Sequence, residues 1–271
     1  MSVSETANTG TLFDAAFGSS PGSWPLPTAT SSQQLWLRAV AAGGQGRYGS
    51  AYSDLALLRR RVETGPLASL AYSTHASFLR QLGWHRLARG WDGRALALGL
   101  AERDPEATAD ALIGLAADAL GVGRLAAAAT LLARAEALPV SERLAVRRRW
   151  VAAELAMAGG DGTTAVRHAE EAAGLAAAMT TASVRHQVKS EVVLAAALCS
   201  AGAVERSRAV AGHALPATAR HGLIPLRWAL ACLLIDTGSV TVAPQQVREL
   251  TEIRDICAGQ VRRAGGTWRT A

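Results

Sequence analysis

The sequence contains few cysteines, few aromatic residues and almost no lysine. Its three cysteines, Cys199, Cys232 and Cys257, are odd in number and far apart, and none belongs to a CxxC pair. This spacing argues against a disulfide framework and against a cysteine-based zinc site. Aromatic residues make up 5% of the chain, and no run of β-branched and aromatic residues alternates with polar ones. The absence of this period-two pattern argues against a β-sheet.

The sequence also lacks long apolar segments. A membrane-spanning helix needs roughly 18–20 consecutive apolar residues, whereas the longest candidate, residues 192–204, lies between Glu191 and Glu205 and contains Gly202. The first basic residue is Arg38, so no positively charged segment precedes an apolar stretch, as it would in a signal peptide. We therefore expect a cytoplasmic protein without membrane spans.

Arginine supplies almost all of the positive charge. The formal net charge is +6, and Lys189 is the single lysine among the 28 basic residues. Together with the many alanines and 26 glycines, this bias is typical of a GC-rich, actinobacterial-type genome. The abundance of arginine is therefore weak evidence for nucleic-acid binding, although a basic protein attracts acidic partners.

A glycine-led pattern recurs along the chain. It consists of a glycine, any residue, a bulky residue, two further residues and a small residue. Copies begin at Gly46, Gly83, Gly123 and Gly202, with a looser copy at Gly160, and successive copies are about 37 to 42 residues apart. A period of this length indicates an array of helical hairpins.

Each part of this pattern has a structural reason. The glycine can end the first helix of a hairpin in a left-handed conformation without a Cβ clash. The small residue lies where the second helix crosses the first, and a larger side chain would push the two helices apart. Over roughly residues 32–264 these segments resemble the tetratricopeptide repeat, with small residues also recurring seven positions before each glycine. The pattern indicates antiparallel helical hairpins, which other α-solenoids and regulator-type helical domains also contain.

We predict an all-α fold, an α-α superhelix (solenoid) of about six antiparallel helical hairpins over residues 32–264. In the last hairpin, a longer turn at residues 237–244 precedes the final helix. Residues 1–31 are rich in Ser, Thr, Gly and Pro, so we predict a disordered N-terminal tail, and we predict that residues 265–271 are a frayed C-terminus. Alternatively, the apolar islands of the tail, residues 12–17 and Trp24, serve as a docking motif or fold back onto the groove of the array.

No motif in the sequence predicts an enzyme. Residues 44–49 match G-x-G-x-x-G, but a helical segment precedes them, whereas a dinucleotide site requires a strand. Residues 18–22 match G-x-S-x-G in a Ser/Pro-rich leader that cannot form a nucleophile elbow. The six histidines form no HxxxH or HExxH pair, and we interpret His75 as a core histidine. We therefore predict no catalytic residues, no metal site and no cofactor. A catalytic function would gain support if His75, His85 and nearby arginines met in a deep pocket.

The resemblance implies that the first helix of each hairpin lines a concave groove. Polar or bulky residues spaced i, i+4 and i+7 on these helices are then the candidates for partner binding. Gln33, Trp36 and Trp228 are further candidates, although Trp36, Trp150 and Trp228 also fit the buried aromatic position near the start of a repeat. The groove residues that we predict are Ser73, Ser77, Arg80, Gln81, Arg147, Trp150, Glu154 and Lys189.

We expect a non-enzymatic adaptor or regulatory module that binds a protein or peptide in its concave groove. Arg80, Arg147 and Lys189 would suit an acidic peptide, or one that presents its C-terminal carboxylate. The alternative is a sensor or regulator module that binds a small peptide or nucleic acid through its basic surface. Nucleic acid is the less favoured partner, because the densest basic patch, residues 147–149, has no interleaved aromatic residues.

Overall fold

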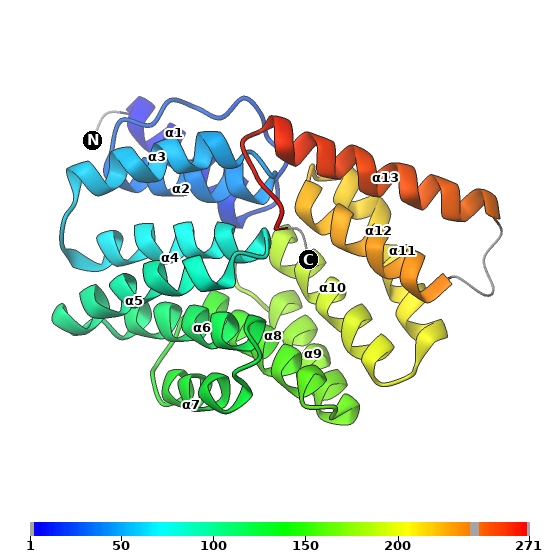
Figure 1. Cartoon of the computed structure of the whole chain (residues 1–271). Helices are drawn as coiled ribbons and strands as arrows, with labels where there is room; N and C mark the ends of the chain where they lie inside the picture. Colours follow the sequence, from blue (N-terminus) through cyan, green and yellow to red (C-terminus); the bar gives the residue numbers. More distant parts are fainter. Residues whose placement is uncertain (1–2, 239–243, 270–271) are drawn as a thin grey trace.

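The computed structural model describes residues 3–238 and 244–269, and helices are the only regular elements in these two ranges. The predicted all-α superhelix is confirmed, because successive helices pack side by side around a common centre (Figure 1). No helix in the described ranges is long and apolar enough to cross a membrane. The helices are α1 (Val3–Phe17), α2 (Ser32–Gly44), α3 (Tyr48–Arg61), α4 (Gly65–Gln81), α5 (His85–Ala101), α6 (Pro105–Gly121), α7 (Leu125–Glu136), α8 (Glu142–Ala158), α9 (Gly162–Ala177), α10 (Val184–Ser200), α11 (Val204–Arg220), α12 (Ile224–Gly238) and α13 (Pro244–Arg263).

Helices α2 to α13 form six hairpins. The first helices of the hairpins, α2, α4, α6, α8, α10 and α12, contact each other in sequence order. They form the inner layer of the superhelix, because each of the second helices from α3 to α11 packs between the first helices on either side of it. Most of the longer turn predicted for the last hairpin, residues 239–243, lies outside the described residues, and α13 begins at Pro244.

The leading glycines occupy the hairpin turns. Gly46, Gly83, Gly123, Gly160 and Gly202 all have φ between +76° and +87°, the left-handed region that favours glycine. The small residues five positions after and seven positions before each glycine are fully buried, which allows the helices to approach closely. The hairpin periodicity is thus confirmed, whereas membership of the tetratricopeptide-repeat family stays a prediction. The buried small residues are Ala39, Ala51, Ala76, Ala88, Ala116, Ala128, Ala153, Ala165, Ala195 and Ser207.

The prediction of a disordered tail over residues 1–31 is wrong for the part of this segment that the structure describes. It begins with α1, which packs against α2 through Leu12, Ala15 and Ala16. These residues are spaced i, i+3 and i+4 and form one apolar helical face, which the surrounding Ser, Thr and Gly residues obscure in the sequence. The chain after α1 is also bonded to the array. The Gln45 side chain donates hydrogen bonds of 2.9 Å to the carbonyl oxygens of Pro21 and Ser23. The alternative interpretation, that this segment folds back onto the array, describes it better.

The prediction of a frayed C-terminus is wrong for residues 265–269, whereas residues 270–271 lie outside the described ranges. After α13 the chain turns back and reaches the second hairpin (Figure 1). Trp84 Nε1 donates a hydrogen bond of 2.7 Å to the carbonyl oxygen of Thr267. Two residues later, the backbone N–H of Arg269 donates a hydrogen bond of 2.9 Å to the carbonyl oxygen of Leu82. This segment is therefore held against the array by specific bonds.

The first and last hairpins of the array meet. Val261 of α13 belongs to the same buried apolar cluster as Leu35 and Tyr48 of the first hairpin, and Trp268 packs against this cluster. Trp268 also stacks on Trp228 of α12, with ring centroids 4.2 Å apart. The solenoid therefore closes on itself, and its concave side becomes a central cavity. The repeat pattern is local and carries no signal for this long-range closure.

Candidate functional site

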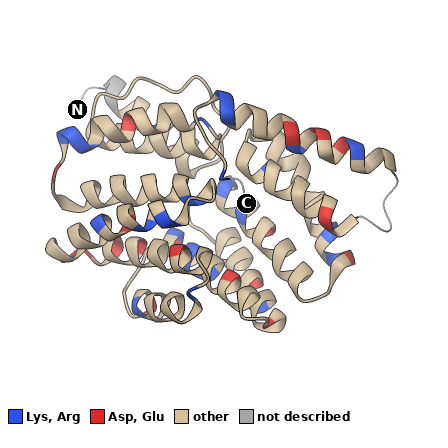
Figure 2. Cartoon of the chain, in the orientation of Figure 1, with Lys and Arg blue, Asp and Glu red and all other residues tan. Residues whose placement is uncertain are grey.

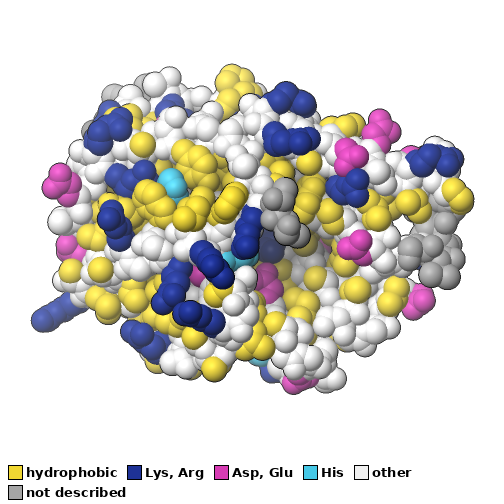
Figure 3. Space-filling model, in the orientation of Figure 1, with side chains coloured by type: hydrophobic (Ala, Val, Ile, Leu, Met, Phe, Trp, Pro, Cys, Tyr) yellow, Lys and Arg dark blue, Asp and Glu magenta, His cyan; other side chains and the backbone are white. Residues whose placement is uncertain are grey.

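A cavity of about 390 Å³ lies at the centre of the closed superhelix. The first helices of the hairpins, the end of α1 and the C-terminal segment supply its walls, and Figure 3 shows a hollow in the middle of the surface with basic side chains beside it. Trp36 and Trp228 line the cavity, whereas Gln33 is not among the lining residues. All eight predicted groove residues line it: Ser73, Ser77, Arg80 and Gln81 on α4, Arg147, Trp150 and Glu154 on α8, and Lys189 on α10. Their role in binding a partner stays a prediction.

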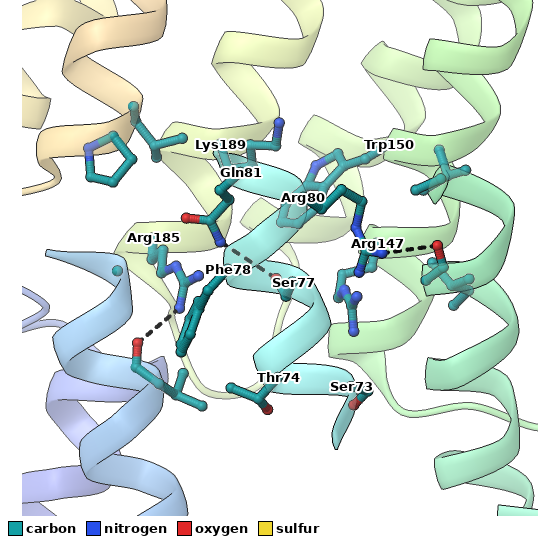
Figure 4. A pocket seen from close by; sticks show the side chains of 18 of the residues that line it. Ser73, Thr74, Ser77, Phe78, Arg80, Gln81, Arg147, Trp150, Arg185 and Lys189 are labelled. Atoms are coloured by element: carbon teal, nitrogen blue, oxygen red, sulfur yellow. Dashed lines mark hydrogen bonds between the residues drawn. The ribbon is translucent and has the colours of Figure 1, made fainter. Parts of the chain in front are cut away.

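The residues from α4 present their polar groups along one side of the cavity (Figure 4). Ser73 Oγ donates a hydrogen bond of 2.9 Å to Asp110 Oδ2, so its hydroxyl hydrogen is already used. Ser77 Oγ accepts a hydrogen bond of 3.4 Å from Gln81 Nε2, and Gln81 Oε1 accepts one of 3.1 Å from the Tyr48 hydroxyl. Because Ser77 acts as an acceptor here, its own O–H group can donate to a ligand.

Arg80 was predicted as a groove cation, and the structure places it in the cavity wall with its charge balanced. Its Nη1 atom donates hydrogen bonds of 2.7 Å to Asp92 Oδ2 and 2.6 Å to Asp118 Oδ1. Burial raises the pKa of Asp92 to about 7, although the charge of Arg80 acts in the opposite direction. Arg80 is therefore a wall residue that joins α4 to α5 and α6, rather than a cation open to a partner.

Two arginines of α8 share a carboxylate. Arg147 Nη1 pairs with Asp110 Oδ1, and Arg143 Nη1 lies 3.7 Å from the same oxygen. Arg143 also lies 3.4 Å from Glu106 Oε1. Burial, and then the charge of Arg80, lowers the pKa of Arg147 to about 10. These two cations are therefore largely balanced by acids of α6.

Sequence analysis missed Arg185, which lines the cavity from α10. Its Nη1 atom donates one hydrogen bond of 3.4 Å to the carbonyl oxygen of Val40, and it has no carboxylate partner in the described part of the chain. By contrast, Lys189 Nζ lies 3.7 Å from Glu154 Oε1. The spacing of Arg185, one helical turn before Lys189, was the signal that could have placed it in the groove.

A row of four rings forms another part of the wall, and we call it the aromatic row. Its members are Trp36, Phe17, His186 and Trp150, and they come from α2, α1, α10 and α8. The ring centroids are 5.4 Å apart between Trp36 and Phe17, 6.4 Å between Phe17 and His186, and 5.4 Å between His186 and Trp150. Phe17 could not be placed from the sequence, because it lies in the segment predicted to be disordered.

Hydrogen bonds hold three rings of the aromatic row in position. The indole N–H of Trp36 donates to a threonine of α4 at 3.0 Å, and that of Trp150 donates to Ser190 Oγ at 2.8 Å. His186 Nδ1 lies 2.8 Å from Ser183 Oγ. Burial lowers the pKa of His186 well below its usual range, so the ring is neutral near pH 7. The row therefore offers a ligand ring surface rather than charge.

Searches of the sequence against protein-family models and against curated proteins found no match.

The two histidines that would have supported catalysis lie in different places. His85 lines the cavity, with its Nδ1 atom 3.9 Å from Asp118 Oδ1. His75 stacks on Trp91 of α5, with ring centroids 3.8 Å apart, and it does not line the cavity. Among the described residues there is also no group of His, Cys, Asp or Glu side chains that could hold a metal ion. The arrangement in which both histidines and arginines share one pocket is therefore not present.

The basic residues 147–149 are divided between two faces of α8. Arg147 faces the cavity, whereas Arg148 and Arg149 pair with Glu136 of α7 at 2.9 Å and 3.0 Å. Figure 2 shows basic residues on many helices, including the inner ends of α4 and α10 near the centre. The triplet therefore does not act as one basic patch.

Proposed function

We propose that this protein is a non-catalytic, cytoplasmic binding module that holds a short segment of a peptide or protein partner in its central cavity. The observation that supports the proposal is the convergence of the eight predicted groove residues on one cavity. These residues come from three helices that are far apart in the sequence. Hydrogen-bonding groups, charged groups and aromatic faces lie together there, a composition typical of binding pockets.

The size of the cavity limits what a partner can insert. Its volume of about 390 Å³ falls within the range of roughly 300–1,000 Å³ that is typical of small-ligand sites. A helix with its side chains is about 10–12 Å across and would need considerably more space. The proposed ligand is therefore the extended end of a chain, rather than the surface of a folded domain.

Polar groups on α4 suit the backbone of such a segment. The Gln81 amide contains one acceptor and two N–H donors, the groups with which a peptide backbone pairs. One of these donors is engaged with Ser77, and the hydroxyl of Ser77 is in turn free to donate. These groups can bind the ligand without sequence specificity, so that specificity comes from the charged and aromatic parts of the wall.

Isothermal titration calorimetry of the full chain with short peptides of defined sequence tests the proposal. Leu120→Trp adds bulk at a lining position of α6, and we expect it to lower the affinity at least about tenfold because it fills space that the ligand needs. Leu87→Trp is the matched control, since Leu87 is 56% exposed on α5. If both variants fold and bind peptides as the wild type does, the cavity is not the binding site.

The alternative is a sensor or regulator module that binds nucleic acid through its basic surface. The pairing of Arg148 and Arg149 with Glu136 reduces the support for it. Phosphate contacts make affinity fall steeply as salt rises, by about 10³–10⁵-fold between roughly 50 and 200 mM for an extensive interface. Titration of a labelled single-stranded oligonucleotide at both salt concentrations would detect such a dependence, which a ligand inside the cavity would not show.

A further inference from the structure

The cations of the cavity wall differ in whether a carboxylate balances them. Arg185 has none among the described residues; it lines the cavity, packs beside Gly44 of α2 and makes one hydrogen bond, to a carbonyl oxygen. A half-buried guanidinium has lost part of its hydration, so the adjacent space favours an anion. The lining cations that have a carboxylate partner are Arg80, Arg143, Arg147 and Lys189. The cavity therefore contains one open site for a single negative charge.

The aromatic row and Arg185 line the same cavity. The carbonyl oxygen that Arg185 contacts belongs to Val40, and Phe17 and Trp36 of the row pack against the apolar cluster that contains Val40. Arg143 places its guanidinium carbon 5.7 Å from the centroid of Phe17. Burial lowers the pKa of His186, and the charges of Arg185, Arg143 and Arg147 lower it further, which agrees with cations close to the row. Because the indole N–H groups of the row are already bonded within the protein, a ligand meets ring surface there.

We propose that the cavity recognises a ligand end in which an aromatic ring stands next to a carboxylate, with the carboxylate bound by Arg185 and the ring packed on the aromatic row. This inference rests on the proposed function and names the chemical class of the inserted segment. Two sources have this chemistry, namely the C-terminal aromatic residue of a peptide and a free aromatic carboxylic acid.

A carboxylate fits this site better than a phosphate does. The planar guanidinium of Arg185 matches the two oxygens of a carboxylate. A phosphate monoester carries close to two negative charges near pH 7, and its second charge would need another open cation. The neighbouring Arg143 and Arg147 already balance Glu106 and Asp110, so a dianion would leave one charge without a partner.

Calorimetric titration of the full chain with matched ligands tests the inference. The ligands are acetyl-Gly-Gly-Phe with a free carboxylate, its C-terminal amide, acetyl-Gly-Gly-Ala and N-acetylphenylalanine. We expect the amide to bind about 10- to 100-fold more weakly than the acid, because it loses a charge-assisted pair with Arg185. We expect the alanine peptide to bind about tenfold more weakly, because it has no ring to pack on the aromatic row.

Variants of the full chain connect this difference to one side chain. We expect Arg185→Gln to lower the affinity for the acid to that for the amide and to leave the amide unaffected. Arg185→Lys keeps the charge without the planar fork, so an intermediate affinity is expected. Arg206→Gln is the matched control, because the Arg206 side chain on α11 is 68% exposed. Should Arg185→Gln fail to fold, the comparison of acid and amide on the wild type still decides the inference.

The outcomes separate this inference from the proposed function. Equal binding of acid and amide to the wild type would overturn the inference, while the proposed function would stand because peptides still bind. If none of the peptides binds and N-acetylphenylalanine does not bind either, both are contradicted. Tighter binding of the phenylalanine tripeptide than of N-acetylphenylalanine supports a peptide end as the source, whereas equal binding supports a free aromatic acid.

Discussion

Replacing Asp92 by asparagine is expected to change how the stability of this protein depends on pH. Asp92 is fully buried on α5 and accepts a hydrogen bond from Arg80. Burial raises its pKa from 3.8 to about 7. Between about pH 4 and about pH 7 the folded chain therefore binds this proton more tightly than the unfolded chain does. As the pH rises through this window, the free energy of unfolding of the wild type therefore falls, because the buried carboxyl group has to ionise. Asparagine does not ionise, so the free energy of unfolding of the variant does not fall for this reason.

The expected magnitude follows from the size of the shift. One unit of pKa difference corresponds to about 1.4 kcal/mol, so a shift from 3.8 to about 7 sets an upper limit on the order of 4 kcal/mol. Asp118 shares Arg80 with Asp92, and shared titration divides the effect between the two carboxyl groups. We expect the variant to gain about 1–3 kcal/mol relative to the wild type across the window.

Two histidines, the half-buried His75 and the buried His186, act in the opposite direction. Burial lowers the pKa of His75 to about 4 and lowers that of His186 well below 6.5, so their contribution to stability is lost as the pH falls. Both proteins contain these histidines, and their effect cancels when the variant is compared with the wild type. The comparison therefore removes the contribution of these two histidines and reports on the coupled carboxyl groups of Asp92 and Asp118.

Urea unfolding followed by circular dichroism, at intervals of about one unit between about pH 4.5 and about pH 7.5, measures the difference. The free energy of unfolding of Asp92→Asn minus that of the wild type should rise with pH. Asp255→Asn is the control for the loss of one carboxylate, since the Asp255 side chain is 61% exposed. A flat or falling difference for Asp92→Asn would refute the reasoning that burial governs this carboxyl group.

Two further predictions test the packing of the array by thermal unfolding. Ala88→Leu overpacks a fully buried helix crossing and should destabilise the protein by about 1–3 kcal/mol. Ala127→Leu, at an exposed position of α7, should leave the stability unchanged. An unchanged melting temperature for Ala88→Leu would mean that the helices do not cross closely there. Leu12→Ala removes a fully buried side chain of α1 and should lower the free energy of unfolding by about 2–5 kcal/mol. Phe13→Ala, at a residue that is 42% exposed, should lower it less. Equal and small effects of the two substitutions would contradict the docking of α1 on α2.

The hairpins could be predicted from the sequence because their determinants are local. A turn glycine such as Gly83 needs only its own positive φ, and a small residue such as Ala88 needs only the neighbouring helix. The same local geometry fixes which face of a helix turns inward. Residues of α4, α8 and α10 could therefore be assigned to the concave side, and the structure brings them to one cavity.

The rest of the site could not be predicted, because it depends on contacts between distant parts of the chain. Phe17 reaches the cavity only because α1 packs on α2, and Trp268 does so only because the chain after α13 returns to the second hairpin. Which cations of the cavity wall are balanced by carboxylates also depends on contacts between distant parts of the chain. Arg80 and Arg185 look alike in the sequence, yet two carboxylates from α5 and α6 balance the first, and no carboxylate of the described residues balances the second.

Closure of the array and binding of a ligand are physically linked in this arrangement. Phe17 from one end of the chain and Trp268 from the other both line the cavity, so a ligand that packs on either ring binds the closed form in preference to an opened one. Such a ligand shifts the equilibrium toward the closed form by at most about 2.7 kcal/mol when its free concentration is about 100 times the dissociation constant. That free energy is comparable to the cost of a single core substitution such as Leu12→Ala. Under the proposed function, binding of a ligand would therefore stabilise the packing of both ends of the chain. Its largest effect on stability would fall on the contacts of α1 and of the C-terminal segment.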